Sequence, residues 1–288
     1  METAIKLEQV MKQYSDKPVL KGVSFSVNKG EIFALLGVNG AGKTTTLECI
    51  EGLRTYDSGQ ITINGKIGVQ LQSSSLPEHI KVKEALVLFA NWAQSHIDNG
   101  LTNKLGLAPL ENKKYKDLST GQQRRLHLAL AMIGNPDILF LDEPTAGLDV
   151  EGRAALHEVI RELNSTGTTI IMASHDMAEV EALCHRIAIL KEGHIAFLGT
   201  ARELTAQAQD HYKILFKASV KVSSEALTTS RIIDEHQGYQ IAEAENLEDS
   251  LLELLTFAKS NSIRIYDLRI EHASLEQRFL DIAKEGQA

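Results

Sequence analysis

Cysteine and long apolar runs are scarce in this sequence. The 288 residues include only two cysteines, Cys49 and Cys184, too few for a disulfide framework and without the spacing of a metal site. That content fits a reducing cytosol. A membrane-spanning helix needs about 20 apolar residues, and the longest apolar runs, such as 32–38, reach only about a third of that. Any membrane span must therefore belong to another chain.

Basic residues are outnumbered, with 30 Lys and Arg against 38 Asp and Glu, for a net charge of −8. Such a chain gains little from counterion release, so we expect no nucleic-acid partner. The hydrophobic fraction of 43% is enough for a sizeable core and argues against disorder. Residues 201–288 hold 10 basic and 15 acidic side chains and no proline, which indicates a separate region. The start, Met1–Lys6, leads directly into strand-like sequence and predicts no signal peptide.

Apolar patterns predict alternating strands and helices, which is typical of an α/β protein. Residues 57–72 are expected to form a hairpin, with Asn64-Gly65 as the turn, and 77–135 to be mostly helical. The other predicted strands are 5–10, 23–27, 32–36, 138–141, 169–173, 187–191, 194–198, 212–222, 239–243 and 263–270. The other predicted helices are 43–52, 150–163, 247–260 and 274–284.

A full phosphate-loop pattern, G-x-x-x-x-G-K-[ST], spans Gly37–Thr44 between a predicted strand and a predicted helix. Glycines let backbone N–H groups turn inward around an anion, and the helix N-terminus adds a favourable dipole. Lys43 is expected at the β- and γ-phosphates and Thr44 on Mg²⁺. The alternative, a chance glycine-rich turn, is disfavoured by this context. The residues predicted to bind the nucleotide here are Gly37, Asn39, Gly40, Ala41, Gly42, Lys43, Thr44 and Thr45.

Two carboxylates, Asp142 and Glu143, end the apolar segment 138–141. A buried strand that ends in an acid places it at the carboxyl edge of the sheet, beside the phosphate loop. Asp142 is expected to orient Mg²⁺ through water, and Glu143 to polarise the attacking water as a general base. Alone, the pair fits solvated acids equally well, but the phosphate loop favours catalysis.

His175 follows another predicted buried strand, where an imidazole could sense or stabilise the γ-phosphate. A lone histidine is more often a surface or core residue. The other nine histidines receive that interpretation.

The order of these segments resembles the ATP-binding cassette ATPase, the nucleotide-binding subunit of ABC transporters. Leu118–Gln122 reads L-S-T-G-Q and resembles the family signature L-S-G-G-Q. Ala146–Asp149 resembles the D-loop, and Ser174-His175-Asp176 the histidine switch. The resemblance covers residues 3–200, approximately, and implies ATP and Mg²⁺ as the bound cofactors.

The resemblance implies further site residues. Tyr14 stands where the family stacks an aromatic ring on adenine. Gln72 fits the Q-loop glutamine, with a catalytic role and a contact to Mg²⁺, and Gln70 is the weaker candidate. His175 takes the role of the switch histidine.

The family also implies a second cassette, because ATP is sandwiched between one subunit's phosphate loop and the other's signature. Ser119, Gly121 and Gln122 would then contact ATP in trans. A homodimer is the simplest arrangement. Taken alone, the signature segment is better explained by Ser119 or Thr120 capping a helix.

Two features depart from the family pattern. Thr120 adds a side chain where glycine lets the backbone approach the nucleotide, so we expect weaker closure. The stretch between Gly65 and Gln72 is shorter than usual, which leaves the register of the Q-loop open. Neither change removes a catalytic group, so we expect an active ATPase.

The resemblance implies a P-loop ATPase cassette over residues 1–205. It would combine a mixed sheet, an antiparallel β subdomain and a helical subdomain at about 73–135. Residues 206–288 are expected to form a small α+β domain that resembles the accessory domain of bacterial export ATPases. Its closing motif, S-L-E-D-x-F-L, is matched at 274–280 with Gln277 in place of the acid. An ordinary amphipathic helix is the alternative.

The sequence therefore predicts an ATPase subunit that powers export through a separate transmembrane permease, as a peripheral protein at the cytoplasmic face of the cell membrane. One alternative is a soluble cassette protein acting on ribosomes or nucleic acid. Such relatives usually carry two cassettes, long coiled coils or zinc-binding cysteines. The other alternative, a regulatory module that binds ATP without turnover, is disfavoured by the intact Lys43, Asp142, Glu143 and His175.

Overall fold

The computed structural model describes residues 2–70, 76–174, 176–206, 212–236, 238–272 and 275–284. The chain divides into two compact units, Met1–Thr200 and Ala201–Ala288. The short helix α7 (Ala201–Ala206) therefore groups with the second unit, although the sequence places the division after residue 205. Among the described residues, no helix has the length and apolar character needed to cross a membrane.

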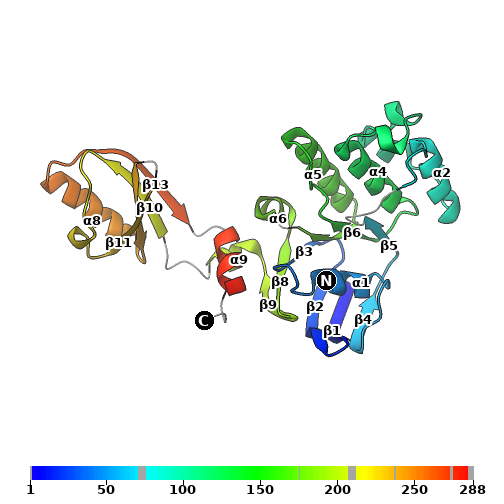
Figure 1. Ribbon diagram of the computed structural model, residues 1–288, viewed down its shortest axis with the longest axis horizontal. Helices are drawn as coiled ribbons and strands as arrows, with labels where there is room; N and C mark the ends of the chain where they lie inside the picture. The colour runs from blue at the N-terminus through cyan, green and yellow to red at the C-terminus, as the bar shows by residue number, and fades with distance from the viewer. Residues whose placement is uncertain are drawn as a thin grey trace. The chain divides into compact units, whose positions relative to one another are not determined.

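A six-stranded sheet, called the large sheet below, is the centre of the first unit (Figure 1). Its neighbouring strands pair in parallel except β9, which runs antiparallel to β8. Every residue of β3 and β7 is buried, as the unbroken apolar runs predict for strands covered on both faces. In spatial order the strands are β5 (Ile67–Gln70), β6 (Ile138–Asp142), β7 (Thr169–Ala173), β3 (Ile32–Leu36), β8 (Arg186–Lys191) and β9 (His194–Gly199).

A second, antiparallel sheet lies in the same unit, in the order β2 (Lys17–Asn28), β1 (Thr3–Tyr14) and β4 (Ser58–Ile63). Helix α1 (Lys43–Ile50) shares one apolar core with both sheets, since Leu47 packs in the same cluster as Leu7 and Phe33. The mixed sheet and the antiparallel β subdomain are thus confirmed. Their common core fixes the start of α1 next to the end of β3.

The predicted hairpin over 57–72 is wrong. Strand β4 pairs with β1, whereas β5 pairs with β6 in the large sheet. Asn64 donates its side-chain amide to the carbonyl oxygen of Thr3 at 2.9 Å, and the Lys66 amide donates to Asp137 at 2.8 Å. A Cβ at Gly65 would lie 2.6 Å from the Cβ of Asp137. Asn64-Gly65 therefore carries the chain from one sheet to the other in a close approach that needs glycine.

Helices cover the face of the large sheet opposite α1 (Figure 1). The segment predicted to be mostly helical is so: it contains α2 (Val82–Trp92), α3 (Asn99–Lys104), η1 (Ala108–Leu110), η2 (Tyr115–Asp117) and α4 (Thr120–Met132). The remaining helices of this unit are α5 (Val150–Ser165) and α6 (Met177–Leu183).

The second unit is an antiparallel sheet with helices, as the predicted α+β pattern requires. Its strand order is β11 (Ser230–His236), β12 (Tyr239–Ala244), β10 (Tyr212–Ala218) and β13 (Ile265–His272). Leu254 of α8 (Leu247–Ser260) packs in one core with Phe216 of β10. The other helices are η3 (Ser224–Ala226) and α9 (Leu275–Lys284). The sequence missed β11, an edge strand whose mostly exposed residues lack apolar alternation.

The approach of β5 to α4 yields a stability prediction. A Cβ at Gly68 would lie 2.1 Å from the carbonyl oxygen of Ala131. We expect Gly68→Ala to lower the free energy of unfolding of the first unit by roughly 2 kcal/mol or more, because backbone would have to move. Urea denaturation measures this change. An unaltered midpoint would contradict the close packing of β5 on α4.

Candidate nucleotide-binding site

The phosphate loop joins the end of β3 to the start of α1. Gly37 and Gly42 have φ of 157° and 108°, and a Cβ at Gly37 would lie 2.5 Å from the carbonyl oxygen of Leu190. Gly42 caps α1 and, as a glycine, offers no side-chain acceptor to the first N–H groups of the helix. Such donors, at the positive end of the helix dipole, favour an anion.

The remaining loop residues differ in exposure. Asn39, Gly40 and Thr44 are exposed, and Thr45 is half-buried. The side chain of Ala41 is buried in the core, so this residue offers a ligand only its backbone.

Lys43 folds back over the loop. Its ammonium donates to the carbonyl oxygens of Gly37 and Val38, the latter at 3.3 Å. Burial lowers the pKa of Lys43, while the carboxylates of Glu143 and Asp142 act in the opposite direction. The structure therefore brings the predicted lysine and the predicted acidic pair into one electrostatic neighbourhood.

Asp142 and Glu143 stand at the end of β6. Burial, followed by repulsion from Glu143, raises the pKa of Asp142, and Lys43 opposes the rise. Glu143 adopts a left-handed backbone with φ of 49°, and its amide donates to the carbonyl oxygen of Ala173 at 2.9 Å. A non-glycine residue in this region is strained, and such strain is concentrated at functional sites. A cation bound here would relieve the repulsion between the two carboxylates.

The signature segment begins α4. Ser119 is its N-cap and forms a capping box with Gln122: the Gln122 amide donates to Ser119 Oγ at 3.3 Å, and the Ser119 amide donates to Gln122 Oε1 at 3.1 Å. Within the described residues, these side-chain bonds run to each other and not to the phosphate loop. The helix-capping interpretation of Ser119 is thus correct as a local description.

The signature also approaches the D-loop segment of the same chain. A Cβ at Gly121 would lie 3.3 Å from Cδ2 of Leu148, and one at Gly147 would lie 3.3 Å from Cγ2 of Thr120. The methyl group of Thr120, the departure from the family pattern, therefore faces Gly147.

Tyr14 lies at the end of β1 with cations beside its ring. Lys12 Nζ is 5.4 Å and Arg54 Cζ 5.3 Å from the ring centroid. Arg54 is in turn paired with Glu48 of α1 at 2.5 Å. Sequence reasoning missed Lys12 and Arg54, since only folding brings the β1–β2 hairpin against the end of α1.

Of the two glutamine candidates and the switch histidine, the structure describes only Gln70. Gln72 and His175 lie outside the described residues. Gln70 ends β5 beside Leu141 and is 2% exposed. Among the described residues, neither polar atom of its side-chain amide has a hydrogen-bond partner.

The donor set can be tested against Mg²⁺. Among the described residues, no three or more His, Cys, Asp or Glu side chains gather as a metal site. Mg²⁺ beside a nucleotide commonly takes one or two protein oxygens and completes its shell with phosphate and water. The Thr44 hydroxyl and the Asp142 carboxylate match that limited donor set.

Comparisons with known proteins identify the family of the chain. The family model described as ABC transporter matches residues 20–146. The linearmycin resistance ATP-binding protein LnrL of Bacillus subtilis is 32% identical, over 96% of this chain and 97% of that protein. The Nod factor export ATP-binding protein I of Burkholderia thailandensis is 41% identical, over 69% of this chain and 72% of that protein.

The solved structure of an ATP-binding subunit of an ABC transporter matches with a TM-score of 0.64 at 27% identity. The match covers 71% of this chain and 92% of that one. With a relative matched over nearly its whole length and a family model over the phosphate loop and acidic pair, the chain belongs to the ATP-binding subunits of ABC transporters, the ATPases that drive transport.

Proposed function

We propose that the chain binds and hydrolyses Mg²⁺-ATP to power export through a separate permease at the cytoplasmic face of the membrane. The observation that carries this proposal is the convergence of the phosphate loop, Lys43 and the pair Asp142 and Glu143 at one edge of the large sheet. This convergence supports an anion site next to a general base.

Each group at this edge has a part in the reaction. The N–H groups at the start of α1 and the ammonium of Lys43 bind the phosphates. Thr44 and Asp142, with Gln72, would hold Mg²⁺, which when bound neutralises charge on the phosphates. Glu143 has a strained backbone and directly follows the end of β6. In the reaction its carboxylate takes a proton from the attacking water.

Tyr14 is proposed to stack on adenine. Its ring is electron-rich and is held among Lys12 and Arg54, and Tyr14 is 37% exposed, so its surface is available to a base. His175 is proposed to contact the γ-phosphate.

A second cassette completes the site. Ser119, Gly121 and Gln122 are at the N-terminus of α4, where backbone N–H groups and the helix dipole favour an anion. We propose that these residues of one copy contact the γ-phosphate bound by another copy. A homodimer therefore forms two complete ATP sites, each from the phosphate loop of one copy and the signature segment of the other.

Export is favoured over import by two observations. The relatives named above carry export or resistance in their names. The closing motif at 274–280 resembles that of export ATPases, and Leu275 in it is buried. The soluble alternative acting on ribosomes or nucleic acid lacks a comparable observation.

An apolar groove of about 570 Å³ is the proposed permease contact. It lies between β5, α2 and α4, with Gln70 and Phe89 among its lining residues. Trp92 and Leu53, also in its lining, are 82% and 63% exposed. A short apolar helix of the permease fits such a groove. Because Gln70 lies on β5, an occupant would touch the strand that pairs with β6, which carries Asp142.

The first prediction about the proposed function concerns turnover. Glu143→Gln removes the base but keeps a side chain of equal size, so ATP binding is retained, ATP-bound dimers accumulate and hydrolysis falls by at least about a hundredfold. Phosphate release and gel filtration with ATP measure both effects. Glu151→Gln, on the first turn of α5, is the matched control and keeps wild-type turnover. Equal hydrolysis by Glu143→Gln and the wild type would remove Glu143 from the base role.

The second prediction concerns the groove. Trp92→Ala removes an exposed ring, so the isolated chain keeps its fold and ATP turnover, while binding to permease-containing membranes weakens about tenfold or more. Sedimentation with such membranes measures binding. Leu198→Ala changes an exposed apolar side chain on β9, away from the groove, and retains wild-type binding. Full membrane binding by Trp92→Ala would place the permease elsewhere.

A further inference from the structure

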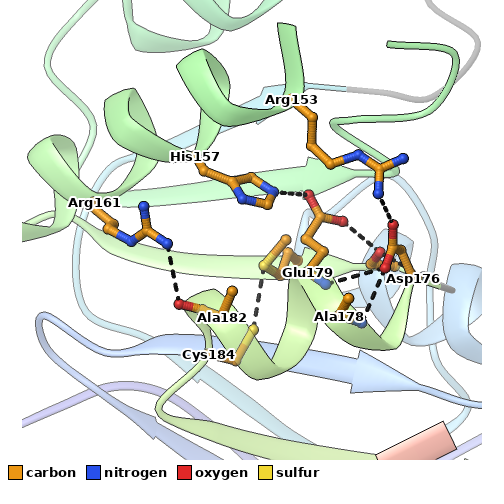
Figure 2. A network of polar contacts seen from close by, with 10 residues as sticks. Arg153, His157, Arg161, Asp176, Ala178, Glu179, Ala182 and Cys184 are labelled. Atoms are coloured by element: carbon orange, nitrogen blue, oxygen red, sulfur yellow. Dashed lines mark hydrogen bonds and ion pairs between the residues drawn. The ribbon is translucent and has the colours of Figure 1, made fainter. Parts of the chain in front are cut away.

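Glu179 is a carboxylate buried inside the first unit. Its side chain is 0% exposed and lies between α5 and α6 (Figure 2). Ser174 Oγ donates to one carboxylate oxygen at 2.6 Å, and His157 Nε2 lies 3.3 Å from the other. A buried carboxylate is costly unless it is hydrogen-bonded, so these partners fix its position.

The partners of Glu179 hold the chain on both sides of residue 175. Ser174 Oγ also accepts from the Asp176 amide at 3.1 Å. Asp176 caps α6 by accepting from the amides of Ala178 at 3.0 Å and Glu179 at 3.2 Å, and the Arg153 guanidinium donates to its carboxylate. Two side chains of α5, Arg153 and His157, are thereby attached to the segment from Ser174 to Glu179.

This anchorage continues to the general base. Ser174 directly follows β7, whose last residue, Ala173, accepts the amide hydrogen of Glu143 at 2.9 Å. A shift of Ser174 would move Ala173 and, with it, the strained backbone of Glu143. At its other end, α5 starts from the D-loop residue Asp149, whose side chain accepts from the Gly152 amide at 2.8 Å.

We propose that Glu179, acting through Ser174 and supported by His157, is a positioning residue for ATP hydrolysis. It holds the end of β7 and the start of α6, so that Glu143 is presented to the γ-phosphate. The inference rests on the role proposed above for Glu143. It requires no contact between Glu179 and ATP.

A positioning role for Glu179 predicts that its loss lowers the turnover rate but not the affinity for ATP. The phosphate loop and Tyr14 belong to other elements, so loss of Glu179 leaves ATP affinity intact. A displacement of about 1 Å in a reacting group costs up to roughly a hundredfold in rate. We therefore expect Glu179→Ala and Ser174→Ala to lower kcat about tenfold to a hundredfold, with KM for ATP within about twofold of wild type. Glu179→Gln still accepts from Ser174 Oγ and recovers most of kcat.

Arg161 supplies the matched control. It extends from the same face of α5 and donates to the carbonyl oxygen of Ala182 at 3.5 Å, so it ties α5 to α6 away from Ser174 (Figure 2). Arg161→Ala lowers stability at most slightly and keeps wild-type kcat. This variant shows whether kcat depends on the contact of Glu179 with Ser174 or on any contact that joins α5 to α6.

The experiment measures kcat, KM and equilibrium ATP binding of the full chain for these four variants, at a temperature where circular dichroism shows each to be folded. A selective fall of kcat in Ser174→Ala and Glu179→Ala, with recovery in Glu179→Gln, supports the proposal. Unchanged kcat in Ser174→Ala overturns it, as does an equal loss in Arg161→Ala or a parallel loss of binding and turnover. If Glu179→Ala does not fold, Ser174→Ala and Glu179→Gln decide the result.

A failure of the proposed function gives a different result from a failure of the positioning role. Wild-type turnover in both His175→Ala and Glu143→Gln would contradict the proposed function itself. Impaired turnover in those variants, with full activity in Ser174→Ala, would contradict only the positioning role.

Discussion

Lys43, Asp142 and Glu143 lie within one another's electric fields at the carboxyl edge of the large sheet. Burial disfavours the charged form of both Lys43 and Asp142, and the two acids repel each other. The opposite charges of Lys43 and the two acids therefore offset part of the cost of burying them. The proposed ligand, a triphosphate with a divalent cation, also carries charges of both signs. The fold therefore holds charges of both signs at this edge before any ligand binds.

The fold holds these charges in place through buried apolar strands. β3, β6 and β7 bring the phosphate loop, the acidic pair and Ser174 to one edge, because parallel strands end on the same side. The hydrogen bond from the Glu143 amide to the Ala173 carbonyl joins the ends of β6 and β7. Glu179 holds the end of β7 through its hydrogen bond with Ser174. Groups far apart in sequence are positioned by the packing of a few strands and of α5 and α6 on them.

Most of this arrangement could be predicted from local sequence. Unbroken apolar runs identify the buried strands, and the phosphate loop is explained by its glycines. The hairpin prediction failed because Asn64-Gly65 is a turn signal whose meaning depends on Asp137, far along the chain. For the same reason Arg54 beside Tyr14 and the contact of Glu179 with His157 could not be foreseen. Both contacts depend on how elements far apart in the sequence pack together, which neither periodicity nor a motif predicts.

In the proposed mechanism two copies of the chain complete one ATP site. This pairing can be tested by measuring the rate of phosphate release per chain from Mg²⁺-ATP as the chain concentration is raised. We expect a specific rate that rises with concentration and then reaches a plateau, as chains pair around ATP. A specific rate that is substantial and independent of concentration, for a chain that stays monomeric with ATP, would contradict it.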